Sequence, residues 1–169
     1  MTAPTGPVED TFVEVMGGVC TPVAVVTAFD GDRPHGTTVS AFASLSRQPP
    51  MVMVALDERS DLLHIVRRTR LVGINVLASV HAGLATRFAG KGAEKFSGVD
   101  WERCHGLPRL AGTSGWLACD VVDLVLGGDH TIVLGRVVGA GSRPAEPLVY
   151  HRRSFGTHRA LDAGGVTAD

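Results

Sequence analysis

Small polar side chains and glycines gather in one stretch, His35 to Asp57, which reads HGTTVSAFASLSRQPPMVMVALD. Its hydroxyl-bearing and glycine positions are Gly36, Thr37, Thr38, Ser40, Ser44 and Ser46. None of these side chains is large enough to cover the backbone, so its N–H and C=O groups can approach a flat polar ligand closely. From composition alone, a Ser/Thr-rich loop between two strands is the more ordinary interpretation.

Other catalytic patterns are missing from the sequence. No Gly-x-Ser-x-Gly surrounds Ser40, Ser44, Ser46 or Ser60, so a serine hydrolase is not indicated. The sequence contains neither a Gly-x-Gly-x-x-Gly after a strand nor a Walker-type phosphate loop, so a dinucleotide would have to bind without them. The seven histidines lack metal-ligand spacing, and we expect no metal site.

His130 has the most suggestive setting of the histidines. It follows Gly127-Gly128-Asp129 at the entrance to a strand, where a turn can present an imidazole at the rim of a barrel. On the residues alone, a histidine in a surface turn is the simpler interpretation.

Composition places the chain among soluble globular proteins. Of its 169 residues, 44% are hydrophobic and 20% charged, which is typical of one ordinary domain. A formal net charge of −1 argues against binding to nucleic acids or membrane surfaces. The cysteines Cys20, Cys104 and Cys119 form no paired spacing, which favours reduced thiols. Without a signal-like start or an apolar run of roughly 20 residues, we expect a cytoplasmic protein.

The predicted elements are mainly short strands. Helices are predicted from a cap at Asp10 to Gly17-Gly18, over 57–70 with Ser60 as N-cap, and after a cap at Ser79. Strands are predicted at 22–28, 51–56, 71–77, 131–138 and 148–150. A further long strand from Leu117 changes its hydrophobic phase at Val121-Val122, which predicts a β-bulge.

The overall pattern predicts an antiparallel barrel with about six or seven strands and two short helices, because no regular βαβ alternation occurs. Residues 101–112 are predicted to be irregular, and residues 90–98 to form a loop that holds both lysines, Lys91 and Lys95. We expect one domain at residues 11–160, with flexible ends at 1–10 and 161–169.

A series of motifs resembles the flavin reductase-like family of FMN-binding split-barrel proteins. The opening stretch supplies Gly36-x-Thr38-x-Ser40-x-Phe42, Ser44-Leu45-Ser46, Pro49-Pro50 and Leu56-Asp57-x-x-Ser60. Later matches are Asn75-Val76-Leu77, Arg87-Phe88-Ala89, Lys95-Phe96, Gly128-Asp129-His130 and Pro147-Leu148-Val149-Tyr150. The likeness runs from about Phe12 to Phe155. It implies a mainly β split barrel with Greek-key-like antiparallel strands.

The resemblance also implies an activity and a site. NAD(P)H would pass a hydride to FMN, or to FAD, with His130 beside the isoalloxazine and the nicotinamide. The flavin would lie between the polar stretch and the second subunit of a homodimer, and reduced flavin would go to a separate oxygenase. The implied cofactor-binding residues are Gly36, Thr37, Thr38, Val39, Ser40, Ser44, Leu45, Ser46, Asp57, Ser60, Asn75, Arg87, Phe88, Lys95, Phe96 and Tyr150.

Alternatives stay open at this point. The same stretch would serve a flavin-binding sensor or electron carrier that uses no pyridine nucleotide, or a pyridoxal-type or deazaflavin oxidoreductase of the wider split-barrel group. Many family members carry Arg-x-Gly after the last tyrosine, whereas here His151-Arg152-Arg153-Ser154 follows. No residue decides between FMN and FAD or between NADH and NADPH.

Overall fold

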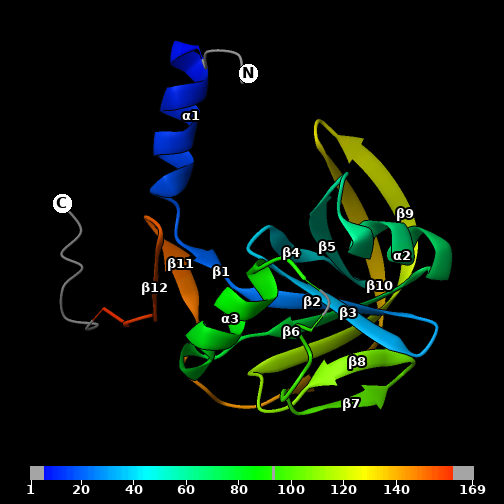
Figure 1. Ribbon diagram of the computed structural model, residues 1–169. Coiled ribbons are helices and arrows are strands. Elements are labelled where there is room, and N and C mark those ends of the chain that lie inside the picture. The colour runs from blue at the N-terminus through cyan, green and yellow to red at the C-terminus, as the bar shows by residue number, and fades with distance from the viewer. Residues whose placement is uncertain (1–5, 93, 162–169) are drawn as a thin grey trace.

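A seven-stranded antiparallel sheet forms the body of the molecule (Figure 1). The structure, a computed structural model, describes residues 6–92 and 94–161. Of the ends predicted to be flexible, 1–10 and 161–169, residues 1–5 and 162–169 therefore lie outside the described residues. The strand order is β3-β2-β6-β9-β10-β5-β4. The bounds are β2 Ala24–Asp30, β3 Arg33–Val39, β4 Phe42–Arg47, β5 Pro50–Asp57, β6 Leu71–Val76, β9 Gly115–Gly127 and β10 His130–Ser142.

The two edge strands of this sheet are joined by only two residues, Ser40 and Ala41. Such a short link cannot span an open sheet, because consecutive Cα atoms lie about 3.8 Å apart. The sheet therefore curls until its edges meet at this point, and the Ala55 N–H donates to the Ala41 carbonyl at 2.9 Å. The predicted antiparallel barrel is confirmed.

Helix α2, Asp61–Thr69, supplies the apolar face that fills the barrel. It contacts β2, β3 and β5, which belong to opposite sides of the sheet order. Its buried side chains join a core with residues of β2, β5, β6, β9 and β10; they are Leu62, Leu63, Ile65 and Val66. Burying each such side chain stabilises the fold by about 1.5–3 kcal/mol. The helix is shorter than the predicted 57–70, because Asp57 ends β5 and Arg70 terminates α2 in the left-handed region at φ 58°.

The other face of β2 is buried as well. Val23 and Val25 pack there with Phe88 of α3, Ala82–Ala89. This second core also includes Leu110 of a hairpin formed by β7, Trp101–Cys104, and β8, Leu107–Leu110. The prediction of irregular structure for 101–112 is wrong. These strands are too short to show a period, and Pro108 obscured the second of them.

An arm of α1 and a three-stranded sheet stands beside the barrel (Figure 1). The sheet consists of β1, Thr21–Pro22, β11, Val149–His151, and β12, Ser154–Gly156. Helix α1 spans Pro7–Gly17 with Gly6 as N-cap, so the predicted cap at Asp10 is wrong and helix already covers part of the segment predicted to be flexible. Pro at the first helical position has a preset φ, which explains the early start.

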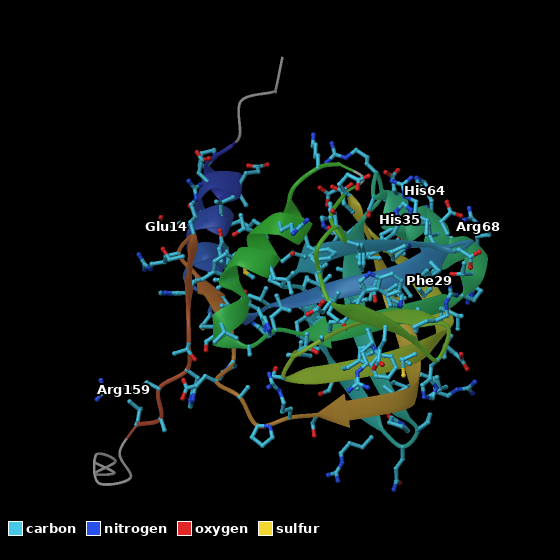
Figure 2. All side chains as sticks on the ribbon, turned by 60° about the horizontal axis from the view of Figure 1, so that its bottom comes forward. Glu14, Phe29, His35, His64, Arg68 and Arg159 are labelled. Atoms are coloured by element: carbon cyan, nitrogen blue, oxygen red, sulfur yellow. The ribbon has the colours of Figure 1, made fainter. Side chains whose placement is uncertain are left out.

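None of the eleven residues of α1 is buried. Phe12 and Val15 are 63% and 61% exposed. Figure 2 shows Glu14 of this helix on the opposite side of the molecule from Arg68 of α2. The arm therefore carries an apolar face that the described residues leave uncovered.

Short elements account for the remaining differences. The described residues form twelve strands, against about six or seven predicted, because strands of two to four residues carry little periodic signal. They form three α-helices, which correspond to the three helical segments predicted individually, although the overall pattern counted two. Ser79 starts a 3-10 helix, Ser79–His81, whose N-cap is Ala78, so Ser79 is not a cap. The predicted bulge is confirmed, since Leu134 pairs with Asp123 and Gly135 with Val121, which leaves Val122 extra. No helix in the described part of the chain is long and apolar enough to span a membrane.

Asn75, predicted to bind cofactor, lies in the interior with 0% exposure. Its amide nitrogen donates to the Val25 carbonyl at 3.2 Å and to the Thr27 hydroxyl at 3.2 Å. Its amide oxygen accepts the Leu110 N–H at 2.8 Å. The side chain thus fastens the β7–β8 hairpin to β2 and β6.

We expect Asn75→Ala to lower the free energy of unfolding by about 2–3 kcal/mol, because buried partners lose their hydrogen bonds. Urea unfolding followed by circular dichroism measures this. The matched control is Thr86→Ala, whose hydroxyl bonds only within α3 and whose loss should cost less than about 0.5 kcal/mol. Equal stabilities for the two variants would contradict the assignment.

Candidate functional site

The predicted polar stretch is not a loop but three strands and the crossing that closes the barrel. Ser40 lies at the crossing, and Ser44 and Ser46 lie on β4. Ser44 faces Val52 and Ser46 faces Met51, so Leu45 is an extra, bulged residue. The bulge turns Leu45 outward, where it is 46% exposed. Ser40 and Ser44 are also exposed, which leaves hydroxyls open at the closure.

One face of β3 is turned toward α3. A Cβ on Gly36 would lie 2.9 Å from the Phe88 ring, so only glycine fits there. The Thr38 hydroxyl donates to the Ala85 carbonyl at 2.7 Å. Thr37 and Val39 alternate with these residues, and Val39 packs on the barrel core. The small residues that suggested close approach to a ligand here allow close approach of a helix.

Arg87, Phe88, Lys95 and Phe96 come together around the loop after α3. The Lys95 ammonium donates to the Phe88 carbonyl at 2.9 Å and to the Gly36 carbonyl at 3.3 Å. Arg87 donates to the Glu94 carbonyl at 3.3 Å and also to the Ser97 carbonyl. Phe96 meets Phe88 edge-on with ring centroids 4.9 Å apart. Burial lowers the pKa of Lys95 below its ordinary value. Both cations therefore fix the loop against β3 and α3.

His130 lies directly opposite Asp57 in the β10–β5 ladder. Two residues before Asp57, Ala55 bonds Ala41 at the barrel closure, so the His130 turn and the polar stretch share one end of the barrel. The imidazole Nδ1 lies 2.7 Å from the Asp129 carboxylate. An ionised carboxylate only accepts, so Nδ1 carries the proton and Nε2 is left for another contact. This hydrogen bond lowers the pKa of Asp129.

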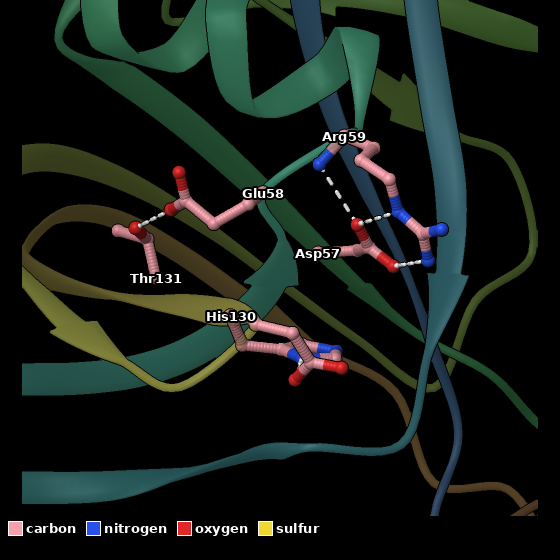
Figure 3. A network of polar contacts seen from close by, with 6 residues as sticks. Asp57, Glu58, Arg59, His130 and Thr131 are labelled. Carbon is pink, nitrogen blue, oxygen red and sulfur yellow. Dashed lines mark hydrogen bonds and ion pairs between the residues drawn. The ribbon is translucent and has the colours of Figure 1, made fainter. Parts of the chain in front are cut away.

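A second network holds the His130 turn in place (Figure 3). The Glu58 N–H donates to the Asp129 carbonyl at 2.9 Å, and the Thr131 hydroxyl donates to the Glu58 carboxylate. Arg67 of α2 donates to both Glu58 oxygens, at 2.8 and 3.0 Å. The Thr131 hydroxyl and then the Arg67 guanidinium lower the pKa of Glu58 below its usual value. None of Glu58, Arg67 and Thr131 was predicted from the sequence.

Asp57 is predicted to bind cofactor, but its carboxylate forms hydrogen bonds and an ion pair with Arg59. The carboxylate accepts the Arg59 backbone N–H at 2.8 Å and its Nε at 3.1 Å on one oxygen, and Nη2 at 2.9 Å on the other. These bonds hold the pKa of Asp57 well below its usual range. The Asp57 carboxylate therefore holds the Arg59 guanidinium beside the site. In the sequence, the Asp-x-Arg spacing at the end of a predicted strand is the signal that could have indicated this ion pair.

Ser60 and Tyr150 complete the predicted set. Ser60 is the N-cap of α2, as predicted, but its side chain makes no capping hydrogen bond among the described residues. Tyr150 lies on β11, where it pairs with Thr21 and its ring centroid is 5.3 Å from that of Phe155. Within a single copy of the protein, Tyr150 therefore belongs to the arm and lies away from the barrel strands (Figure 1).

Two surface hollows of about 490 and 510 Å³ lie elsewhere. One borders the β7–β8 hairpin and is lined by Arg109, Trp116 and Arg143, and the other borders α3 and includes Arg87. Neither is lined by the polar stretch or the His130 turn. We place the site at the barrel closure, because that is where the chemically suggestive residues meet.

Comparison with known proteins identifies the domain family. Residues 16–159 match the flavin reductase like domain. The chain is 41% identical over 146 residues to the reductase component of 4-nitrophenol 4-monooxygenase/4-nitrocatechol 2-monooxygenase from Rhodococcus opacus, covering 86% of this chain and 78% of that one. It is 37% identical over 152 residues to the flavin reductase (NADH) of Kitasatospora aureofaciens, covering 86% and 80%.

The fold agrees with solved structures as well. The NADH:FAD oxidoreductase of Streptomyces globisporus, solved in complex with NAD and FAD fragments, superposes with a TM-score of 0.85 at 31% identity. The superposition covers 96% of this chain and 99% of the other. The predicted split-barrel fold class is therefore confirmed.

Replacing Lys95 by alanine separates a phosphate-binding role from a structural one. If its ammonium meets a flavin phosphate, Lys95→Ala should weaken FMN binding by about 1–2 kcal/mol, as expected for a charge-assisted hydrogen bond. Lumiflavin, which lacks the phosphate, should bind unchanged. Quenching of flavin fluorescence measures both, with exposed Lys91→Ala as the control. Equal losses for FMN and lumiflavin would mean that Lys95 acts only by fixing the loop.

Proposed function

Because the chain belongs to the flavin reductase-like domain family, we propose that it oxidises NADH or NADPH and passes a hydride to FMN or FAD. The observation that carries this is the meeting of the His130 turn and the polar stretch at one end of the barrel. A hydride donor at the turn and a flat acceptor against the stretch would then be neighbours, as hydride transfer requires.

The residues present fit a flavin. Ser40 and Ser44 are exposed at the closure, and β4 pairs on one side only, with β5, in the described sheet. Thr38 and Ser40 would hold the pyrimidine edge, although the Thr38 hydroxyl proton is already donated to Ala85 and only its lone pairs remain. The phosphate and ribityl chain would contact Ser44, Ser46, Ser60, Arg87 and Lys95. Bound flavin supplies the electron-accepting chemistry.

His130 has a positioning and electrostatic role in this proposal. Asp129 fixes its tautomer, so Nε2 can accept a hydrogen bond from the nicotinamide carboxamide. Hydride transfer removes no proton from the substrate, so the imidazole is not required as a base. Glu58, Thr131 and Arg67 keep the turn in register with β5.

Reduced flavin would be handed to a separate oxygenase. The support is the Rhodococcus relative, which is the reductase component of a monooxygenase. A cytoplasmic location agrees with Cys20, Cys104 and Cys119, which are free thiols in the described structure.

Steady-state assays with each pairing of NADH or NADPH with FMN or FAD test the activity. We expect nucleotide oxidation, followed at the nicotinamide absorbance band, in at least one pairing. The protein should also lose most of its flavin on dialysis, since a flavin that is handed on cannot be held tightly. Absence of turnover in all four pairings would overturn the reductase proposal, and a flavin retained through dialysis would favour a carrier.

We also propose a homodimer in which the apolar face of α1 packs against the second copy. Exposed apolar patches of this kind mark protein interfaces. Sedimentation equilibrium should give the mass of two chains. A double change of Phe12 and Val15 to serine should shift the equilibrium toward monomer, whereas Val80→Ser, at a site that is 81% exposed but outside the arm, should not. A monomeric parent protein would contradict the proposal.

A further inference from the structure

Arg59 is held in a fixed position although it is on the surface. Its side chain is 87% exposed, and an exposed arginine ordinarily samples many rotamers. Here its backbone N–H, its Nε and its Nη2 all bond the Asp57 carboxylate. Asp57 thereby orients the guanidinium before any ligand arrives (Figure 3).

The bonds to Asp57 use only one edge of the guanidinium. An arginine side chain has five N–H donors, and Asp57 takes the Nε–H and one of those on Nη2. Both N–H groups of Nη1 and the second of Nη2 remain. No acceptor for them occurs among the described residues. The open Nη1–Nη2 edge matches two oxygens of a phosphate in bidentate geometry.

Arg59 lies at the same end of the barrel as His130. Asp57 faces His130 across the ladder, at the about 4.5–5.5 Å spacing of paired Cα atoms. Arg59 follows two residues later on the same rim. A nicotinamide beside His130 is separated from its pyrophosphate by one ribose, and the flavin phosphate lies one ribityl chain from the ring.

Neighbouring charges limit the attraction to short range. Asp57 and Asp129 lie near Arg59, and both raise its pKa. Glu58 is paired with Arg67 and with Thr131, so it does not compete for Arg59. The site is thus not a broadly positive surface, and binding would rest on directed hydrogen bonds rather than on net charge.

We propose that Arg59, oriented by Asp57, binds a phosphate group of the nucleotide or flavin that reacts at the His130 turn. The proposal deepens the proposed function and rests on it. It transfers to Arg59 the ligand contact that the sequence had assigned to Asp57, and it gives Asp57 a positioning role. The phosphate belongs either to the pyridine nucleotide or to the flavin, and the two sources are distinguishable.

The test compares Arg59→Gln with the parent protein. With riboflavin as acceptor, which has no phosphate, a rise of about tenfold in the KM for NADH and a kcat within twofold would assign the nucleotide phosphate. An about tenfold rise in the Kd for FMN, with the Kd for riboflavin unchanged, would assign the flavin phosphate instead. Asp57→Asn should give a smaller loss of the same kind, because the guanidinium keeps its charge but loses its fixed orientation.

Arg103→Gln is the matched control, since Arg103 also pairs with an aspartate, Asp32, at 3.1 Å. Unchanged binding of NADH and FMN in Arg59→Gln would overturn the proposal, as would equal losses for FMN and riboflavin or equal effects in Arg103→Gln. An Asp57→Asn protein identical to the parent would refute the orienting role. If the parent protein shows no turnover, the proposed function fails, but titration of FMN, riboflavin and NADH by fluorescence still tests Arg59.

Discussion

The two-residue link between β3 and β4 is the constraint on which the structure depends. These strands are the opposite edges of a seven-stranded sheet, and Ser40-Ala41 forces them to meet. Closure brings β5 beside the crossing through the Ala55–Ala41 hydrogen bond, and β5 in turn pairs with the start of β10. The polar stretch and His130 become neighbours because of this closure, although about ninety residues separate them in the chain.

The segment after β5 connects the closed sheet to helix α2. Between Asp57 and Asp61 the chain leaves the sheet and enters α2, which fills the barrel. The three residues between these ends have separate tasks: Glu58 braces the turn, Arg59 extends an oriented guanidinium, and Ser60 begins the helix. The anchored ends of β5 and α2 keep this segment rigid, and rigid supports position reactive groups more accurately than mobile loops do.

Polar contacts also fix the segments that lie outside the barrel strands. Lys95 and Arg87 tie the loop after α3 to β3 and α3 through backbone carbonyls, and Asn75 ties the β7–β8 hairpin to β2 and β6. The Asn75 contacts are buried and the Lys95 contacts half-buried, so an unpaired group there would be costly, whereas the Arg87 contacts are exposed. Of these contacts, the bond from Lys95 to the Gly36 carbonyl reaches β3, the strand that leads into the closure.

Local patterns in the sequence determined a good part of this protein. The bulge at Val122 followed from a phase change along one strand, the turn before His130 from its glycines, and the N-cap at Ser60 from its position before an apolar stripe. The family followed from the order of the motifs and agrees with the match over residues 16–159. Each of these signals lies within a short window of the chain.

Only the tertiary structure decided which side chains meet. Asn75 turned inward because the β7–β8 hairpin, some thirty residues later, supplies its partners, and Gly36 is small because Phe88 packs on it. Asp57 faces an arginine rather than open solvent because β5 ends there and the chain turns back over it. Such pairings depend on topology and on distances across the barrel, and hydrophobic periodicity or turn chemistry within a window does not contain them.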